Sequence, residues 1–86
     1  MKKGIYSKEN QYFIDLMVQA RLKMGVTQAE LAKRLEKPQS FVSKYEKGER
    51  RLDVIEFVTV CKTLKVDPRK IFNKILKMTR PGLRQP

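Results

Sequence analysis

The chain has 86 residues and a formal net charge of +11, because 20 lysine and arginine residues face only 9 aspartate and glutamate residues. An excess of this size in so short a chain predicts a polyanionic partner, with nucleic acid ahead of an anionic membrane surface. One cysteine and no histidine exclude an internal disulfide and a Cys/His zinc site. No nucleophile–base spacing of an enzyme is present, so we expect no catalytic residue, no metal and no cofactor.

Three regions are expected along the chain. Residues 1–8 should form a basic flexible arm, residues 9–78 a folded domain, and residues 79–86 a C-terminal tail. Asp15 interrupts the apolar residues near the N-terminus, which argues against a signal peptide or a membrane span. The lone cysteine fits a reducing compartment, and we expect a cytoplasmic protein.

The first two helices are predicted from apolar spacing and from capping residues. Apolar residues recur at three- and four-residue steps from Glu9 to Met24, and Gly25 follows where a helix ends. Thr27 with Glu30 forms a capping box, which predicts a second helix that ends at about residue 35 or 36.

The third and fourth helices are bounded by proline and by a second capping box. Pro38 cannot continue the second helix and suits the first turn of a third helix that runs to Gly48. Asp53 with Glu56 predicts a fourth helix to about residue 64. The apolar stripe of this fourth helix is predicted to comprise Val54, Phe57, Val58, Cys61 and Leu64.

A fifth helix completes the predicted fold. Asp67 as its cap and Pro68 at its first position place it from there to about Met78. Cys61 is interpreted as a small core residue rather than a reactive thiol. No segment shows the alternation typical of a strand, so the fold class is all-α, with five short helices in one bundle.

The third predicted helix has two unlike faces. Val42 and Tyr45 lie on one side and can be buried. The other side carries hydrogen-bonding and cationic side chains, namely Gln39, Ser40, Ser43, Lys44 and Lys47. Glutamine can pair with adenine, lysine can donate to guanine, and serine can bond either base. This side is therefore suited to reading DNA base edges; the alternative is a polar face that meets only water.

Short motifs around this helix carry a specific resemblance. Thr-Gln-x-x-Leu-Ala, Ser-Lys-x-Glu-x-Gly and Val-Asp-Pro occur in this order, with only about three residues between the second and third helices. Together they resemble the Xre/Cro type of phage-repressor-like helix-turn-helix DNA-binding domain over about residues 12–76. The resemblance implies a five-helix phage-repressor-like bundle whose third helix enters the major groove.

The resemblance also implies roles for individual side chains. Gln39, Ser40 and Lys44 match positions that contact base edges. Gln28, Ser43 and Lys47 match positions that contact phosphate. In the family, the residue at the position of Gln28 also braces the first residue of the recognition helix.

Two further features of the family concern structure. Arg21 and Glu46 match a recurrent ion pair that ties the first helix to the end of the third. The family usually has glycine where Glu36 and Lys65 stand, so either these turns differ or the chain tolerates left-handed backbone strain of roughly 1 kcal/mol. Pro38 replaces the usual serine or threonine cap of the recognition helix.

Basic residues continue beyond the third helix. Arg50 and Arg51 are expected to contact DNA phosphate, although Arg51 could instead form a salt bridge with Glu49 or Asp53. Residues 69–84 contain six cations and no acid. This basic segment is interpreted either as a solvated face or as a second DNA contact.

The apolar side of the fifth helix is broader than packing in one small bundle requires. Phe72, Leu76 and Met78 are therefore predicted to contact a second copy of the chain in a homodimer, with packing in the core alone as the alternative. Family members usually bind two-fold sites, with half-sites about 10 bp apart.

The sequence as a whole favours a sequence-specific, double-stranded DNA-binding transcriptional regulator, a dimeric repressor associated with the nucleoid. An alternative is an antitoxin-like module of the same fold that binds and neutralises a protein partner. A third interpretation, a membrane-surface or RNA binder that uses charge alone, predicts binding without sequence preference.

Overall fold

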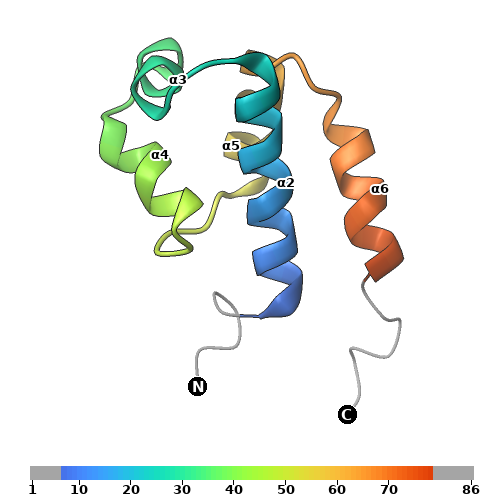
Figure 1. The fold of residues 1–86 in the computed structure, drawn as a ribbon. Helices are drawn as coiled ribbons and strands as arrows, with labels where there is room; N and C mark the ends of the chain where they lie inside the picture. The colour runs from blue at the N-terminus through green and yellow to red at the C-terminus, as the bar shows by residue number, and fades with distance from the viewer. Residues whose placement is uncertain (1–6, 79–86) are drawn as a thin grey trace.

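The computed structural model describes residues 7–78, which form five α-helices and no strand. The helices are α2 (Lys8–Met24), α3 (Gln28–Leu35), α4 (Gln39–Glu46), α5 (Val54–Thr63) and α6 (Pro68–Met78) (Figure 1). The predicted all-α fold class is confirmed. The predicted tail, and residues 1–6 of the predicted arm, lie outside the described residues.

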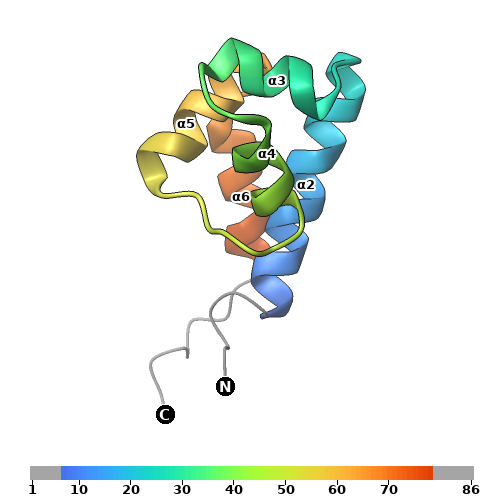
Figure 2. The same cartoon turned by 90° about the vertical axis from the view of Figure 1, so that its left-hand side faces the viewer.

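Helix α2 runs through the middle of the bundle. Helices α4 and α6 lie on opposite sides of it, and α3 crosses one end (Figure 1). The view turned by 90° shows α4 in front and α6 behind, with α5 beside them (Figure 2). Because α2 lies between α4 and α6 and contacts both, the predicted recognition helix and the C-terminal helix are on opposite sides of the bundle.

Side-chain caps fix where most of the helices begin. The Thr27 hydroxyl accepts the Glu30 N–H at 3.0 Å, and the Glu30 carboxylate accepts the Thr27 N–H at 2.7 Å. Asp53 and Glu56 form the same reciprocal pair before α5. Both predicted capping boxes are therefore present, and each satisfies backbone donors that the helix itself leaves unpaired.

Helix α2 begins at Lys8, one residue before its predicted start. The Ser7 hydroxyl caps it by accepting the Asn10 N–H at 3.0 Å. This cap was not predicted, because Ser7 is not followed three residues later by glutamate or glutamine, the second half of a capping box.

The turns after α3 and α5 place non-glycine residues in the left-handed region. Glu36 and Lys65 both have a φ of 59°. After α3, the Lys37 N–H bonds the Ala32 carbonyl and the Glu36 N–H bonds the Lys33 carbonyl, both at 3.0 Å, which is the pattern of a Schellman turn. Of the two alternatives open at these turns, the chain keeps the family geometry and accepts the strain.

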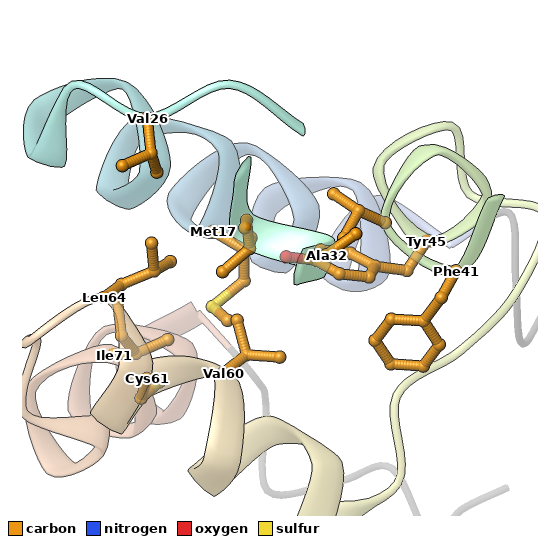
Figure 3. Packing of buried hydrophobic residues seen from close by; sticks show 11 residues of the cluster. Met17, Val26, Ala32, Phe41, Tyr45, Val60, Cys61, Leu64 and Ile71 are labelled. Atoms are coloured by element: carbon orange, nitrogen blue, oxygen red, sulfur yellow. The ribbon is translucent and has the colours of Figure 1, made fainter. Parts of the chain in front are cut away.

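The hydrophobic core lies where all five helices meet (Figure 3). Its most deeply buried side chains are Met17, Leu31, Val42, Tyr45, Val60 and Cys61. Burial raises the pKa of the Cys61 thiol to about 11, so this cysteine is a packing residue as predicted.

One prediction about the core needs correction. Val54, assigned to the buried stripe of α5, is 70% exposed, whereas Val60 is 1% exposed. The rest of the predicted stripe holds, since Cys61 and Leu64 are buried and Phe57 and Val58 half-buried. Val54 departs from it because it is the first residue of α5, at the edge of the contacts with α3 and α6.

The Tyr45 hydroxyl is an unusual feature of this core. Among the described residues it has no hydrogen-bond partner, although the atom is fully buried. Figure 3 shows the hydroxyl directed into the apolar cluster. Burial raises its pKa well above the ordinary value of tyrosine, so the group stays neutral.

Candidate nucleic-acid interface

The α3–α4 pair has the compact geometry of two helices joined by a tight turn. Only residues 36–38 separate them. Pro38 is the N-cap of α4, the position implied by the resemblance, and does not lie in the first turn as the helix signals predicted. Its ψ is 154°, and it makes no side-chain hydrogen bond to the helix. Because proline offers no side-chain acceptor, the first N–H groups of α4 have no side-chain cap.

One side of α4 is buried against the bundle. Val42 and Tyr45 are buried as predicted, at 0% and 2% exposure. Phe41 is buried too, at 8%, and the sequence analysis did not assign it. Its ring packs edge to face on the Tyr45 ring, with 5.7 Å between the centroids. Three large side chains therefore hold this eight-residue helix in a single orientation.

The opposite side of α4 faces outward. The three predicted base-contact residues, Gln39, Ser40 and Lys44, are all exposed, and so is Lys47 just beyond the helix. Ser43 is half-buried, and its hydroxyl donates to the Ser40 carbonyl at 3.4 Å. The structure thus brings the five polar side chains to one side of the helix, and their contacts with DNA remain predictions.

The C-terminal end of α4 is held by a cluster around the Glu46 carboxylate. Arg21 of α2 donates to it through Nε at 2.8 Å and through Nη2 at 3.1 Å. Gln28 of α3 donates to it through Nε2 at 2.8 Å. The remaining terminal nitrogen of Arg21 donates to the Val26 carbonyl at 2.9 Å. One carboxylate therefore links three helices.

This cluster is largely shielded from solvent. The side chains of Arg21 and Glu46 are 12% and 6% exposed. The hydrogen bond from Arg21 to Glu46 raises the pKa of the Arg21 guanidinium, so the arginine stays charged. The arginine neutralises an acid that would otherwise repel phosphate on the predicted DNA-facing helix.

Gln28 is placed differently from the expectation. Its side-chain amide nitrogen bonds Glu46 at the end of α4, rather than bracing Gln39 at the beginning of that helix. The amide nitrogen carries two hydrogens, so one of them remains for a phosphate. The predicted phosphate contact of Gln28 is compatible with the observed bond.

A second cluster follows α4 and was not predicted. Arg50 donates to both Glu56 oxygens, at 3.0 and 2.8 Å, and to the Arg51 carbonyl at 2.8 Å. Its guanidinium carbon lies 4.7 Å from the centroid of the Phe41 ring. Arg50 therefore fastens the loop after α4 to the start of α5 and covers the aromatic anchor of α4.

The two arginines after α4 have different surroundings. Hydrogen bonds from Arg50 and from the Asp53 N–H lower the pKa of Glu56 to about 2. Arg50 is thus already paired, and its predicted phosphate contact would have to use the exposed part of its guanidinium. Arg51 is exposed, and within residues 7–78 it forms no salt bridge with Glu49 or Asp53. The phosphate contacts of both arginines remain predictions.

Helix α6 exposes three apolar side chains: Phe72 and Leu76 share one flank, whereas Met78 lies in the row of the buried Ile71. Phe72 and Leu76 are each 55% exposed and Met78 is 37% exposed. Phe72 borders a groove of about 320 Å³ that also touches Val54 and the beginning of α2. The residues predicted to contact a second copy are therefore accessible, next to a further exposed apolar side chain.

Two kinds of feature are absent from residues 7–78: a helix that could span a membrane and a cluster of side chains that could hold a metal ion. None of their helices combines the length and the apolar character of a transmembrane span. No group of acidic and cysteine side chains in this range is arranged to hold a metal ion.

Comparisons with known proteins bear on the same helices. A sequence model of the family described as Helix-turn-helix matches residues 17–71, from the middle of α2 into α6. Among solved structures, the chain is similar to one described as an XRE-family like protein from Pseudomonas syringae pv. tomato str. DC3000. The two share 49% sequence identity and a TM-score of 0.82, over 91% of this chain and 95% of that one. Comparison with curated proteins gives no match.

Proposed function

Given that the chain belongs to the Xre/Cro-type helix-turn-helix family of DNA-binding regulators, we propose that it recognises a specific double-stranded DNA sequence by placing α4 in the major groove. The observation that carries this proposal is the contrast between the exposed and the buried side of α4. Gln39, Ser40 and Lys44 are exposed on one side, while the other side is fixed in the core. A helix held in this way presents its polar groups at defined positions, as base recognition requires.

Charge supports the phosphate part of the proposal. The net charge of +11 favours approach to DNA of any sequence. Lys47 and Arg51 are exposed on either side of the turn that follows α4. These two cations, with Gln28 and Ser43, would fix the register of α4 on the duplex.

We further propose that two copies bind a two-fold site with half-sites about 10 bp apart. The exposed flank of α6, with Phe72 and Leu76, supports this assembly, because apolar groups exposed together favour association. The dimer would repress transcription by occupying its site in the nucleoid of the cytoplasm.

Selection of bound sequences from random duplexes is the direct test of sequence recognition. We expect an enriched, two-fold symmetric motif. Gln39→Ala should then weaken binding to that motif by about 1–3 kcal/mol and leave binding to random DNA nearly unchanged. Gln19→Ala, which alters an exposed glutamine on α2, is the matched control and should change neither.

Two results would argue against base recognition by α4: selection without enrichment, or an equal loss on cognate and random DNA for Gln39→Ala. Lys47→Ala separates phosphate contacts from base contacts. It should weaken binding to all sequences and reduce the salt slope by about one unit.

The dimer is tested by sedimentation of paired leucine variants. Leu76 and Leu22 have the same 55% exposure, but Leu22 lies on α2, away from the proposed interface. Leu76→Glu should shift the protein to monomer, whereas Leu22→Glu should leave its assembly unchanged. Equal behaviour of the two variants would remove the α6 flank from the interface.

A further inference from the structure

The other flank of α6 borders a second groove with a different character. This groove lies between α6 and the C-terminal half of α2 and encloses about 650 Å³. Its floor is apolar and includes the buried side chains Leu64 and Ile71 and the half-buried Ala20 and Met24. Its polar lining includes five lysines, Lys23, Lys65, Lys70, Lys74 and Lys77.

The positive charge of this groove is only partly compensated in the described structure: the Asp67 carboxylate, whose pKa is lowered mainly by hydrogen bonds from Arg69, also interacts with Lys70. No aspartate or glutamate lines it. Within residues 7–78, none of the five lysines takes part in a salt bridge. Asp67, at the start of α6, is bound by Arg69 at 3.1 Å. Five cations gathered around an apolar floor favour a ligand that is both acidic and apolar.

The groove is separate from the predicted DNA interface and from the predicted dimer flank. On α2, Arg21 points to Glu46 of α4, whereas Lys23 and Met24 line the groove with α6. Helices α4 and α6 lie on opposite sides of α2 (Figures 1 and 2). On α6, Phe72 and Leu76 project from the flank opposite to the lysines.

We propose that this groove binds an acidic amphipathic helix of a partner protein. Lys70, Lys74 and Lys77 follow one another along α6 over about 10 Å, or about two turns of an α-helix. A helix lying along this row would place apolar side chains on the floor and glutamates against the lysines on both sides. A DNA backbone could use the lysines, but it has no apolar groups for the floor.

The inference goes beyond the proposed DNA recognition and does not depend on it. It describes how a second protein would be recruited to this regulator while α4 stays free. The lysines and the apolar floor of the groove define the partner as acidic and amphipathic.

A synthetic peptide provides the test. The probe is a fluorescent helix of about five turns with leucines on one side and glutamates on both flanks. The control peptide has the same composition in an order that destroys the apolar side. By fluorescence anisotropy, the amphipathic peptide should bind at least about tenfold more tightly than the control peptide, and its affinity should fall as salt is raised.

Two charge-reversal variants locate the binding site. Lys74→Glu should weaken binding of the peptide by about fivefold or more. Lys62→Glu changes an exposed lysine of α5 outside the groove and should have less than about a twofold effect. Lys74→Glu should leave the selective binding of DNA through Gln39 intact. Met24→Gln, checked for folding by circular dichroism, should weaken the peptide complex because it makes the floor polar.

Three outcomes would overturn the proposal. The two peptides could bind equally, which would indicate attraction by charge alone. The two lysine variants could behave alike, which would place the peptide elsewhere. Random duplex DNA or vesicles of anionic lipid could lose affinity on Lys74→Glu while the peptide fails to bind, which would assign the lysines to phosphate groups instead of a protein.

Discussion

The C-terminal end of α4 is fastened by two ionic clusters, whereas its N-terminal end follows a strained turn and has no side-chain cap. At the C-terminal end, Glu46 joins Arg21 and Gln28, and Arg50 in the following loop joins Glu56. The Arg50 guanidinium also reaches back over Phe41, in the first turn of α4. At the N-terminal end, Glu36 is left-handed and Pro38 offers no acceptor. The residues proposed to contact bases begin at this less constrained end. The two ends of α4 are therefore held by different means: ionic clusters at the C-terminal end, and the burial of Phe41 and Val42 near the N-terminal end.

Removing the charge of Glu46 tests the stronger end and should have the largest effect. Glu46→Gln leaves the Arg21 guanidinium, which is 12% exposed, without its carboxylate. Because loss of one partner of a buried ion pair is costly, we expect Glu46→Gln to lower the free energy of unfolding by about 3 kcal/mol. Urea denaturation measures this change. Glu49→Gln alters an exposed glutamate in the following loop and should stay within about 0.5 kcal/mol. A similar small change for both variants would show that the cluster contributes little.

Acid should release the second cluster at the same end. The pKa of Glu56 is lowered to about 2 from an ordinary value of 4.5. Because the folded-state pKa is the lower one, the stabilisation is complete above pH 4.5 and is lost as the pH falls toward 2. Arg50 is 39% exposed, so solvent screening reduces the contribution to about 1 kcal/mol.

The comparison of wild type with Glu56→Gln isolates this contribution from other carboxylates. The difference between their free energies of unfolding should be constant from pH 7 to about 5 and should shrink toward pH 2. A difference that stays constant over the whole range would mean that Glu56 is not ionised in a stabilising pair.

Replacing Glu36 in the turn before α4 tests the N-terminal end of that helix. We expect this change to have the smallest effect on the free energy of unfolding. Glycine adopts the φ of 59° without the cost that Glu36 carries, about 1 kcal/mol. The greater freedom of glycine in the unfolded chain offsets part of this gain. Glu36→Gly should therefore raise the free energy of unfolding by about 0.5 kcal/mol. Glu36→Ala keeps the Cβ atom and should show no gain; equal gains would trace the effect to the lost charge.

Features set by neighbours in the sequence were predictable. The capping boxes at Thr27 and Asp53 and the burial of Val42 and Tyr45 follow from short spacings, and the structure contains them. The Arg21–Glu46 contact spans 25 positions, and only the resemblance to a known family suggested it.

Features set by the packing of separate segments were missed. Glu56 was assigned to a capping box, and nothing local indicates that the same carboxylate also binds Arg50 across a loop. The place of Phe41 depends on Arg50 lying over its ring. The exposure of Val54 depends on where the contacts of α5 with its neighbours end, and apolar spacing alone does not determine that edge.

The bond between Gln28 and Glu46 joins the start of α3 to the end of α4. The two helices are therefore preorganised as one rigid body before any duplex is met. Little conformational entropy remains to be lost in that part of the protein on association. We therefore expect any folding upon binding to be confined to segments outside this helix pair. Discrimination among DNA sequences would then arise from how well the fixed surface of α3 and α4 fits the groove of each duplex.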